Sequence, residues 1–132
     1  MDGLSRCRVA AVALLIALPA VACARHDRQL QDHEQTLSSV AASVNRIGEA
    51  WLSGETSGTF TAVALEQMFQ AVEAERAAVA ADPAFIRDPR GASLADSASE
   101  LCRRVALMLG AVQGADSATL RHQLDGLPFI TS

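Results

Sequence analysis

The amino-acid sequence predicts an all-α protein: an antiparallel three-helix bundle with a short fourth C-terminal helix, preceded by a cleaved signal peptide. Half of its 132 residues are apolar by type, and only 4% are aromatic. The apolar residues recur at intervals of three and four, which places them on one face of each helix. No run of alternating β-branched residues and no Asn-Gly turn indicates a strand. Short connections between helices of similar length favour antiparallel neighbours.

The N-terminal residues 1–22 have the layout of an export signal. Arg6 and Arg8 give a positive start, and an unbroken run of ten apolar residues follows at positions 9–18. Pro19 then precedes a group of small residues, as in a secretory signal peptide. The apolar stretch is shorter than the roughly 20 residues that a membrane-spanning helix needs. We therefore expect this segment to be cleaved.

The cleavage site determines whether the chain is lipidated. Ala20-Val21-Ala22-Cys23 resembles the lipobox of bacterial lipoproteins, with alanine at the first position, where leucine is usual. The resemblance covers these four residues and implies that Cys23 carries a thioether-linked diacylglycerol and becomes the acylated first residue. The residue after the cysteine is Ala24 and not aspartate, which resembles the pattern of lipoproteins that are sorted to the outer membrane. The alternative is ordinary cleavage, before Cys23 or after Ala24, which releases a soluble periplasmic or secreted protein.

Residues 23–32 are expected to form a polar tether that includes the start of the first helix, which is expected over residues 27–53. The residues expected on its buried face form a stripe with spacings of 3, 4, 3, 4, 3 and 4. This is the pattern of a helix that packs along its whole length. The stripe consists of Leu30, His33, Leu37, Val40, Val44, Ile47 and Trp51. A polar loop bounded by Gly54 and Gly58 ends the helix. The bundle domain as a whole is expected over residues 27–132.

The second helix is expected to begin at Thr61. Threonine can cap the free backbone amides of a first turn, and Phe60 and Leu65 would form a hydrophobic staple around it. The helix is expected to end at Asp82, because the residue before Pro83 is pushed out of the helical region. Its apolar residues are Leu65, Met68, Phe69, Val72 and Val79.

The third helix is expected to begin at Ser93, which forms a capping box with Asp96, and to end at Gly114. Its stripe alternates spacings of four and three and consists of Leu94, Ala98, Leu101, Val105, Met108 and Val112. A short fourth helix follows over residues 117–125, with Asp116 as its cap. Its apolar residues are Leu120 and Leu124.

The connector between the second and third helices, residues 82–92, is expected to be a turn-rich loop, because it contains two Asp-Pro steps and a glycine. It sets two apolar and two cationic side chains in an otherwise polar segment, which makes it the best candidate for a partner contact. These side chains are Phe85, Ile86, Arg87 and Arg90. In the alternative, Phe85 and Ile86 fold back as a lid on the end of the bundle.

Histidines and methionines raise a second hypothesis, a small periplasmic haem or metal carrier. His33 occupies a core position, and His122, Met68 and Met108 also lie in helices. Histidine and methionine side chains ligate haem iron. His26, His33 and His122 are weak candidates for binding a divalent metal. The first two are two helical turns apart, too far to share one ion. We expect ordinary packing for these residues and no resident cofactor or metal.

The third helix contains two further features of chemical interest. Cys102 is expected to be a small, partly buried apolar side chain. The alternative is a disulfide with Cys23 or with a second chain in an oxidising compartment. Glu100 stands three and four residues before Arg103 and Arg104, a spacing that predicts surface ion pairs.

The composition of the chain and the motifs that it lacks exclude several classes of function. The formal net charge of −4 argues against nucleic-acid binding. The chain has no Lys for a Schiff base and no Tyr, and it lacks Gly-x-Ser-x-Gly and Cys-x-x-Cys motifs. We therefore predict no catalysis, and a bacterial cell-envelope lipoprotein with a binding or structural role. Its expected partners are the membrane, through Cys23, and an envelope protein. Self-association through an exposed stripe is the alternative.

Overall fold

The structure, a computed structural model, describes the backbone of residues 3–130 and the side chains of residues 20–130. All secondary-structure elements in that range are α-helices, so the all-α prediction is confirmed. The chain divides into two compact units, residues 1–32 and residues 33–132. The predicted export signal falls in the first unit, largely outside the residues whose side chains are described. Within the described residues, no helix combines the length and apolar character needed to cross a membrane.

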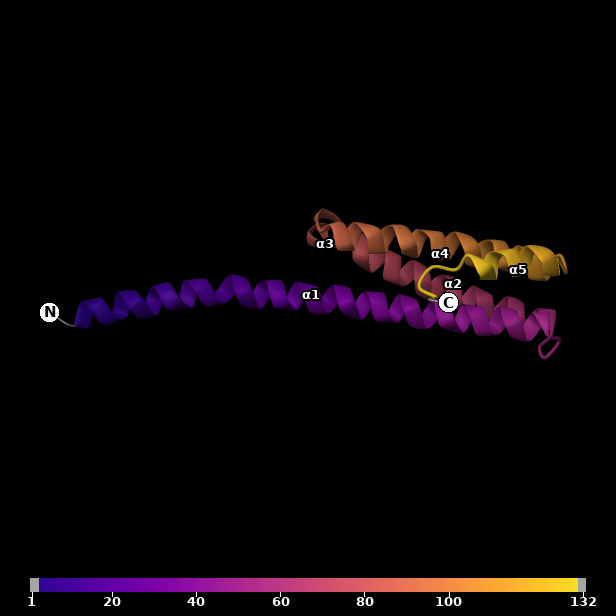
Figure 1. Cartoon of the computed structure of the whole chain (residues 1–132), viewed down its shortest axis with the longest axis horizontal. Coiled ribbons are helices and arrows are strands. Elements are labelled where there is room, and N and C mark those ends of the chain that lie inside the picture. The colour runs from indigo at the N-terminus through magenta and orange to yellow at the C-terminus, as the bar shows by residue number, and fades with distance from the viewer. Residues whose placement is uncertain (1–2, 131–132) are drawn as a thin grey trace. The chain divides into compact units, whose positions relative to one another are not determined.

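The second unit is a helical bundle. Its elements are the C-terminal part of α1 (Gly3–Leu52), followed by α2 (Gly58–Ala81), α3 (Pro83–Arg87), α4 (Pro89–Gln113) and α5 (Ser117–Asp125). The long helices α2 and α4 run antiparallel beside each other, and the short α3 connects them at one end (Figure 1). The short α5 packs against α4 at the opposite end (Figure 1).

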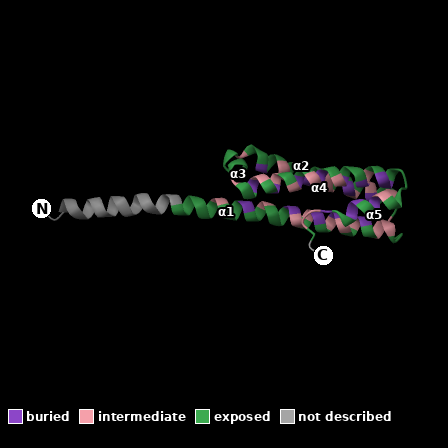
Figure 2. Cartoon of the chain, turned by 45° about the horizontal axis from the view of Figure 1, so that its top comes forward, coloured by how far each residue is buried: buried purple, intermediate pink, exposed green. Residues whose placement is uncertain are grey.

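The stripe of α4 supplies the centre of the core. All six of its predicted positions are buried, from Leu94 at 8% exposed to Met108 at 0%. Buried residues also lie on the other helices of the bundle (Figure 2). They include Leu65, Val72 and Val79 of α2 and Leu120 and Leu124 of α5. Since burying one such side chain stabilises the fold by roughly 1.5–3 kcal/mol, this core is the main source of stability.

On α1, the buried line is shifted from the predicted stripe toward smaller residues. Leu37 and Val44 are fully buried, as predicted. Four other predicted positions are only partly buried, namely His33, Val40, Ile47 and Trp51. Ala41 and Gly48 are buried at the centre of the interface instead. Counting large apolar residues does not reveal this shift, because neither residue contributes much apolar surface.

Gly48 allows three helices to meet. A Cβ at this position would lie 2.8 Å from Cδ2 of Leu124 on α5 and 3.2 Å from Cε of Met108 on α4. Both distances are shorter than ordinary van der Waals contact. The absence of a side chain therefore brings α4 and α5 close to this part of α1.

Helix α2 begins earlier than predicted. Its N-cap is Ser57, whose hydroxyl oxygen accepts a hydrogen bond from the backbone N–H of Phe60 at 3.2 Å. Thr61, the predicted cap, is instead buried inside the helix and donates its hydroxyl hydrogen to the carbonyl of Ser57 at 2.9 Å. Phe60 is 62% exposed, so the predicted staple with Leu65 does not form. Serine and threonine are both good caps, and here the serine lies where it also allows the threonine to be buried.

The connector at residues 82–92, predicted to be a loop, is helical. Asp82 and Asp88 are the N-caps of α3 and α4, and each carboxylate accepts a 2.9 Å hydrogen bond from the backbone N–H two residues ahead. A proline follows each aspartate at the start of its helix, where a missing N–H costs no helical hydrogen bond. The Asp-Pro steps therefore begin helices here and are not turns.

The early start of α4 also removes the predicted capping box. Ser93 and Asp96 lie inside the helix, because α4 already begins at Pro89. The later boundaries agree with the prediction. Gly114 is the C-cap of α4, and Asp116 caps α5 by accepting a hydrogen bond from the backbone N–H of Thr119 at 3.0 Å.

The first turn of α4 packs directly on the backbone of α3, which gives a prediction. A Cβ on Gly91 would lie 1.9 Å from the carbonyl oxygen of Phe85. We expect Gly91→Ala to lower the free energy of unfolding by about 2 kcal/mol or more, because the α3 backbone has to move. Gly110→Ala, also in α4, meets nothing within 4 Å and should raise the free energy of unfolding by about 0.5–1 kcal/mol. Urea unfolding measures both variants, and equal effects would contradict this packing.

Candidate functional site

His33 joins three helices at one end of the bundle. Its Nδ1 lies 2.7 Å from Oε2 of Glu75 on α2. Its ring meets Phe85 of α3 edge-on, with 5.6 Å between ring centroids and 80° between ring planes. The imidazole is 24% exposed, and the carboxylate provides the hydrogen bond that a partly buried polar group needs. These contacts give His33 a structural role at the α3 end.

The other candidate ligands for haem or metal lie elsewhere. His122 is exposed on α5, at the end of the bundle opposite α3 (Figure 1). Met108 is fully buried in the core and Met68 is partly buried on α2. His33 and His122 therefore cannot bind one iron or metal ion together. His26 belongs to the first unit. Across the described residues, no three His, Cys, Asp or Glu side chains are arranged to hold a metal ion.

The segment proposed as a partner contact separates into buried and exposed parts. Phe85 is 3% exposed and covers the end of the bundle beside His33, as the lid alternative expects. Ile86 does not fold back and is 46% exposed. Arg87 and Arg90 are exposed as well. A surface contact can therefore use the last three side chains but not the phenyl ring.

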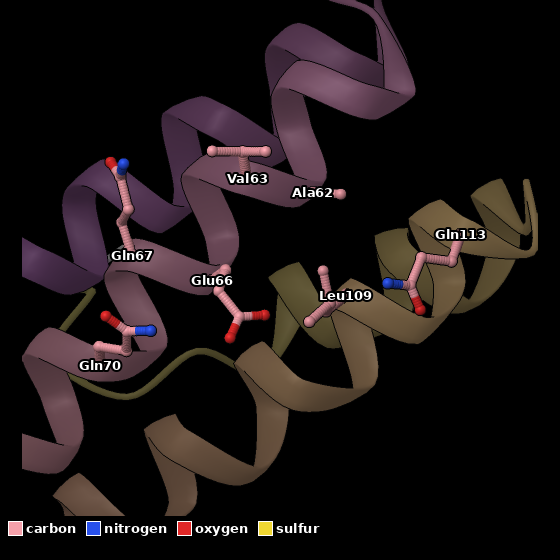
Figure 3. A pocket seen from close by; sticks show the side chains of 7 residues that line it. All are labelled: Ala62, Val63, Glu66, Gln67, Gln70, Leu109 and Gln113. Carbon is pink, nitrogen blue, oxygen red and sulfur yellow. The ribbon is translucent and has the colours of Figure 1, made fainter.

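An open groove of about 480 Å³ lies between α2 and α4 (Figure 3). Its lining residues are Ala62, Val63, Glu66, Gln67, Gln70, Leu109 and Gln113. The carboxylate of Glu66 points from α2 toward Leu109 of α4 (Figure 3). Throughout the described part of the chain, no hydrogen bond or ion pair involves Glu66. The groove thus combines apolar walls, side-chain amides and one unpaired negative charge.

A second carboxylate lies one heptad further along the same pair of helices. Glu73 is seven residues after Glu66, and Cys102 is seven residues before Leu109, so the two pairs repeat on the antiparallel helices. Both carboxylate oxygens of Glu73 accept hydrogen bonds from Arg76, at 3.0 and 2.9 Å. The Cys102 thiol also donates to Oε1 at 3.0 Å. These hydrogen bonds, first from Arg76 and then from Cys102, lower the pKa of the Glu73 carboxyl to about 2.

The same contact makes Cys102 unreactive. Burial and, after it, the hydrogen bond to the Glu73 carboxylate raise the pKa of the Cys102 thiol to about 12. Because the thiolate is the reactive form, this thiol is a poor nucleophile at neutral pH. Cys102 is a free cysteine, buried as the simpler sequence interpretation expects. Cys23 is also free, and it is exposed in the first unit.

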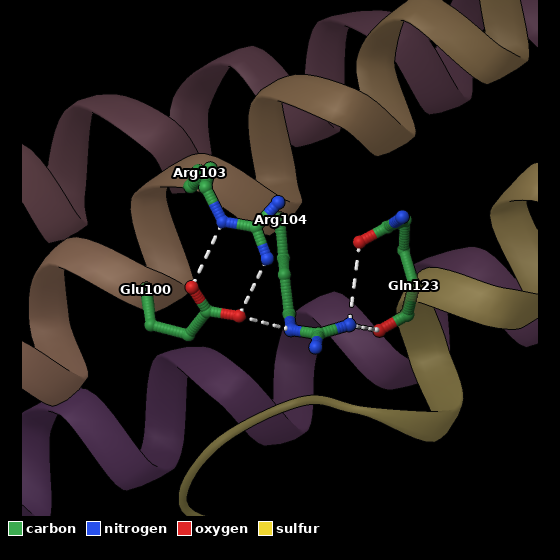
Figure 4. Close-up of polar contacts among 4 residues, drawn as sticks. All are labelled: Glu100, Arg103, Arg104 and Gln123. Carbon is green, nitrogen blue, oxygen red and sulfur yellow. Dashed lines mark hydrogen bonds and ion pairs between the residues drawn. The ribbon is translucent and has the colours of Figure 1, made fainter.

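Polar contacts attach α5 to α4. The predicted pairs form: Glu100 accepts hydrogen bonds from Arg103 at 2.9 and 2.7 Å and from Arg104 at 2.7 Å (Figure 4). Hydrogen bonds from Arg103, and then from Arg104, lower the pKa of the Glu100 carboxyl to about 2. Arg104 also donates to the backbone and side-chain oxygens of Gln123, both at 3.3 Å. The side chain of Arg104 therefore bridges the two helices, and Gly126 leaves room for its guanidinium.

The solvent-facing side of α2 has a second periodic pattern that sequence reasoning missed. We call it the α2 outer stripe: Phe60, Val63, Gln67, Gln70, Ala74, Ala77 and Ala81. Its spacings are 3, 4, 3, 4, 3 and 4, every member is exposed, and none is charged. Phe60 is 62% and Val63 55% exposed. The signal was available in the sequence as an uncharged heptad outside the apolar stripe, but glutamine and alanine do not stand out in a hydrophobicity pattern.

Comparisons of this chain with protein-family models, with curated proteins and with solved structures find no match.

The buried thiol makes a prediction about alkaline pH. The pKa of Cys102 is about 12 in the folded state and about 9 in an unfolded chain, so folding strengthens proton binding. The protonated thiol therefore contributes to the free energy of unfolding. This contribution is fully present below pH 9 and is lost as the pH rises toward 12. In a chain that starts at Ala24, no Lys or Tyr titrates in this range and Cys102 is the single thiol. We expect its free energy of unfolding to fall by a few kcal/mol between these pH values.

Urea unfolding at several alkaline pH values, under reducing conditions, measures this loss. The control is Cys102→Ala, whose free energy of unfolding should change little over the same range. An equal decline in both proteins would mean that the thiol proton does not contribute to stability.

Proposed function

We propose that this chain is an exported lipoprotein of the bacterial cell envelope and that its helical bundle acts by binding a partner. The observation that carries the proposal is the sequence Ala20-Val21-Ala22-Cys23, placed directly after a positively charged start and an apolar run. In the described part of the first unit, Cys23 is an exposed free thiol, which suits acylation. The mature chain then begins at Cys23 and carries an antiparallel three-helix bundle with its additional short helices.

Lipidation determines where the bundle operates. Each methylene buried in the bilayer contributes about 0.8 kcal/mol, so two or more acyl chains give lasting attachment where a single chain does not. Residues 24–32, expected to be a polar tether, are helical as part of α1, and this helical segment then links the anchor to the bundle. Displayed in this way on the periplasmic side or at the outer membrane, the bundle meets partners near the membrane surface.

Two features support a binding role for the bundle. The α2 outer stripe exposes apolar and uncharged side chains over the length of a long helix. Beside it, the groove between α2 and α4 holds an unpaired carboxylate. Exposed apolar surface of this kind, rimmed by polar groups, is typical of contact sites. We do not propose the haem or metal carrier: His33 and His122 lie at opposite ends of the bundle and cannot bind one ion together, and Met108 is fully buried in the core.

The lipid anchor predicts the mass of the mature protein. Purified from its own host, the chain should begin at Cys23 and be heavier than its amino-acid sequence by a diacylglycerol and an acyl group. Intact mass spectrometry of the membrane fraction measures this. Cys23→Ser should abolish the added mass, whereas Cys102→Ser, the matched control, should keep it. An unmodified chain that begins at Cys23 or Arg25 and is recovered from the soluble periplasmic fraction would refute the anchor.

A further inference from the structure

Two carboxylates on the same side of α2, Glu66 in the groove and Glu73 one heptad beyond it, differ in what neutralises them. Glu73 has a bidentate pair with Arg76 and a hydrogen bond from Cys102. Glu66 stands one heptad earlier, where the residues three and four positions ahead are Phe69 and Gln70. No cation is therefore in reach on its own helix, and the facing residue on α4 is Leu109. An exposed carboxylate with no cation in reach on its own helix can pair with a cation from outside the chain.

The spacing of the exposed residues beside Glu66 suits packing against a helix. The members of the α2 outer stripe are spaced as the a and d positions of a coiled coil, in which side chains of one helix enter the spaces of another. The stripe covers residues 60–81, about 30 Å at 1.5 Å per residue. Its large apolar members, Phe60 and Val63, lie at the end next to Glu66, and its alanines allow close approach at the other end.

The charged residues beside the α2 outer stripe indicate whether its partner is a different protein or a second copy of this chain. Along the α2 outer stripe, Glu66 and Glu73 flank one side, and three alanines, Ala64, Ala71 and Ala78, flank the other. In an antiparallel pair of α2 helices the two acidic flanks would face each other, which is unfavourable. In a parallel pair each acidic flank would face alanines and Glu66 would stay unpaired. Neither arrangement neutralises the carboxylate, so a helix with basic flanking residues is the better fit.

We propose that α2 docks an amphipathic helix of a partner protein, whose apolar stripe lies on the α2 outer stripe and whose Arg or Lys side chain pairs with Glu66. This inference rests on the proposed binding role, but it does not depend on lipidation of Cys23. The surface involved consists of the α2 outer stripe and the groove between α2 and α4.

Two synthetic helical peptides test the proposal on the full mature chain. Both have leucine and alanine at alternating three- and four-residue spacings, and they differ only in having Arg or Glu at the flanking positions. Fluorescence anisotropy of the labelled peptides at low salt measures their affinities. We expect the Arg peptide to bind more tightly, and Glu66→Gln to reduce this preference roughly threefold, the size of one exposed ion pair. Val63→Gln should weaken both peptides.

A matched variant separates this site from the overall negative charge of the protein. Glu49→Gln removes the same charge from an exposed position on α1 and should leave the preference unchanged. The proposal is overturned if both glutamine variants reduce the preference equally, or if neither peptide binds at millimolar concentration. It is also overturned if sedimentation shows a dimer of the chain alone that Val63→Gln dissociates, since the occupant would then be a second copy. None of these outcomes bears on the mass test of the lipid anchor.

Discussion

The burial of one side of α4 is the interaction on which the rest of the bundle depends. Its stripe, from Leu94 to Val112, is buried over its whole length, and α2, α3 and α5 all pack against this helix. A helix of this size cannot keep such a stripe in water, because most of the stability of protein helices comes from packing an apolar face. Surrounding α4 with antiparallel helices satisfies that requirement and fixes which faces of α2 remain outside.

Small residues and polar contacts then set how the helices fit together. Gly48 and Gly91 allow approaches that a methyl group would prevent. Around the core, ion pairs and hydrogen bonds join His33 to Glu75 and Arg104 to Gln123. These pairs are partly exposed, and such pairs contribute little free energy, so they orient the helices more than they stabilise them. Glu66 differs from these groups, because it forms no ion pair with any residue that the structure describes.

The sequence predicts the apolar positions of the core better than the boundaries and the surface. The stripe of α4 and the cap at Asp116 follow directly from residue type and spacing. The Asp-Pro steps were misread because aspartate and proline favour both turns and helix starts, and only tertiary packing decides between them. The burial of Gly48 was missed because glycine gives no apolar signal. The sequence does not single out the α2 outer stripe, because alanine and glutamine are ordinary on any helix surface; the structure identifies it by showing that every member is exposed.

The most direct test of the buried core is the unfolding of two matched variants of α1, the helix that packs on α4 at Gly48. Val44 is fully buried and Ala42, two residues earlier, is exposed. If apolar burial in the core holds the bundle together, Val44→Asp should lower the free energy of unfolding in urea by about 3 kcal/mol or more, because it places a charge there. Ala42→Asp should change it by less than about 1 kcal/mol. Equal stability of the two variants would show that apolar burial in the core does not hold the bundle together.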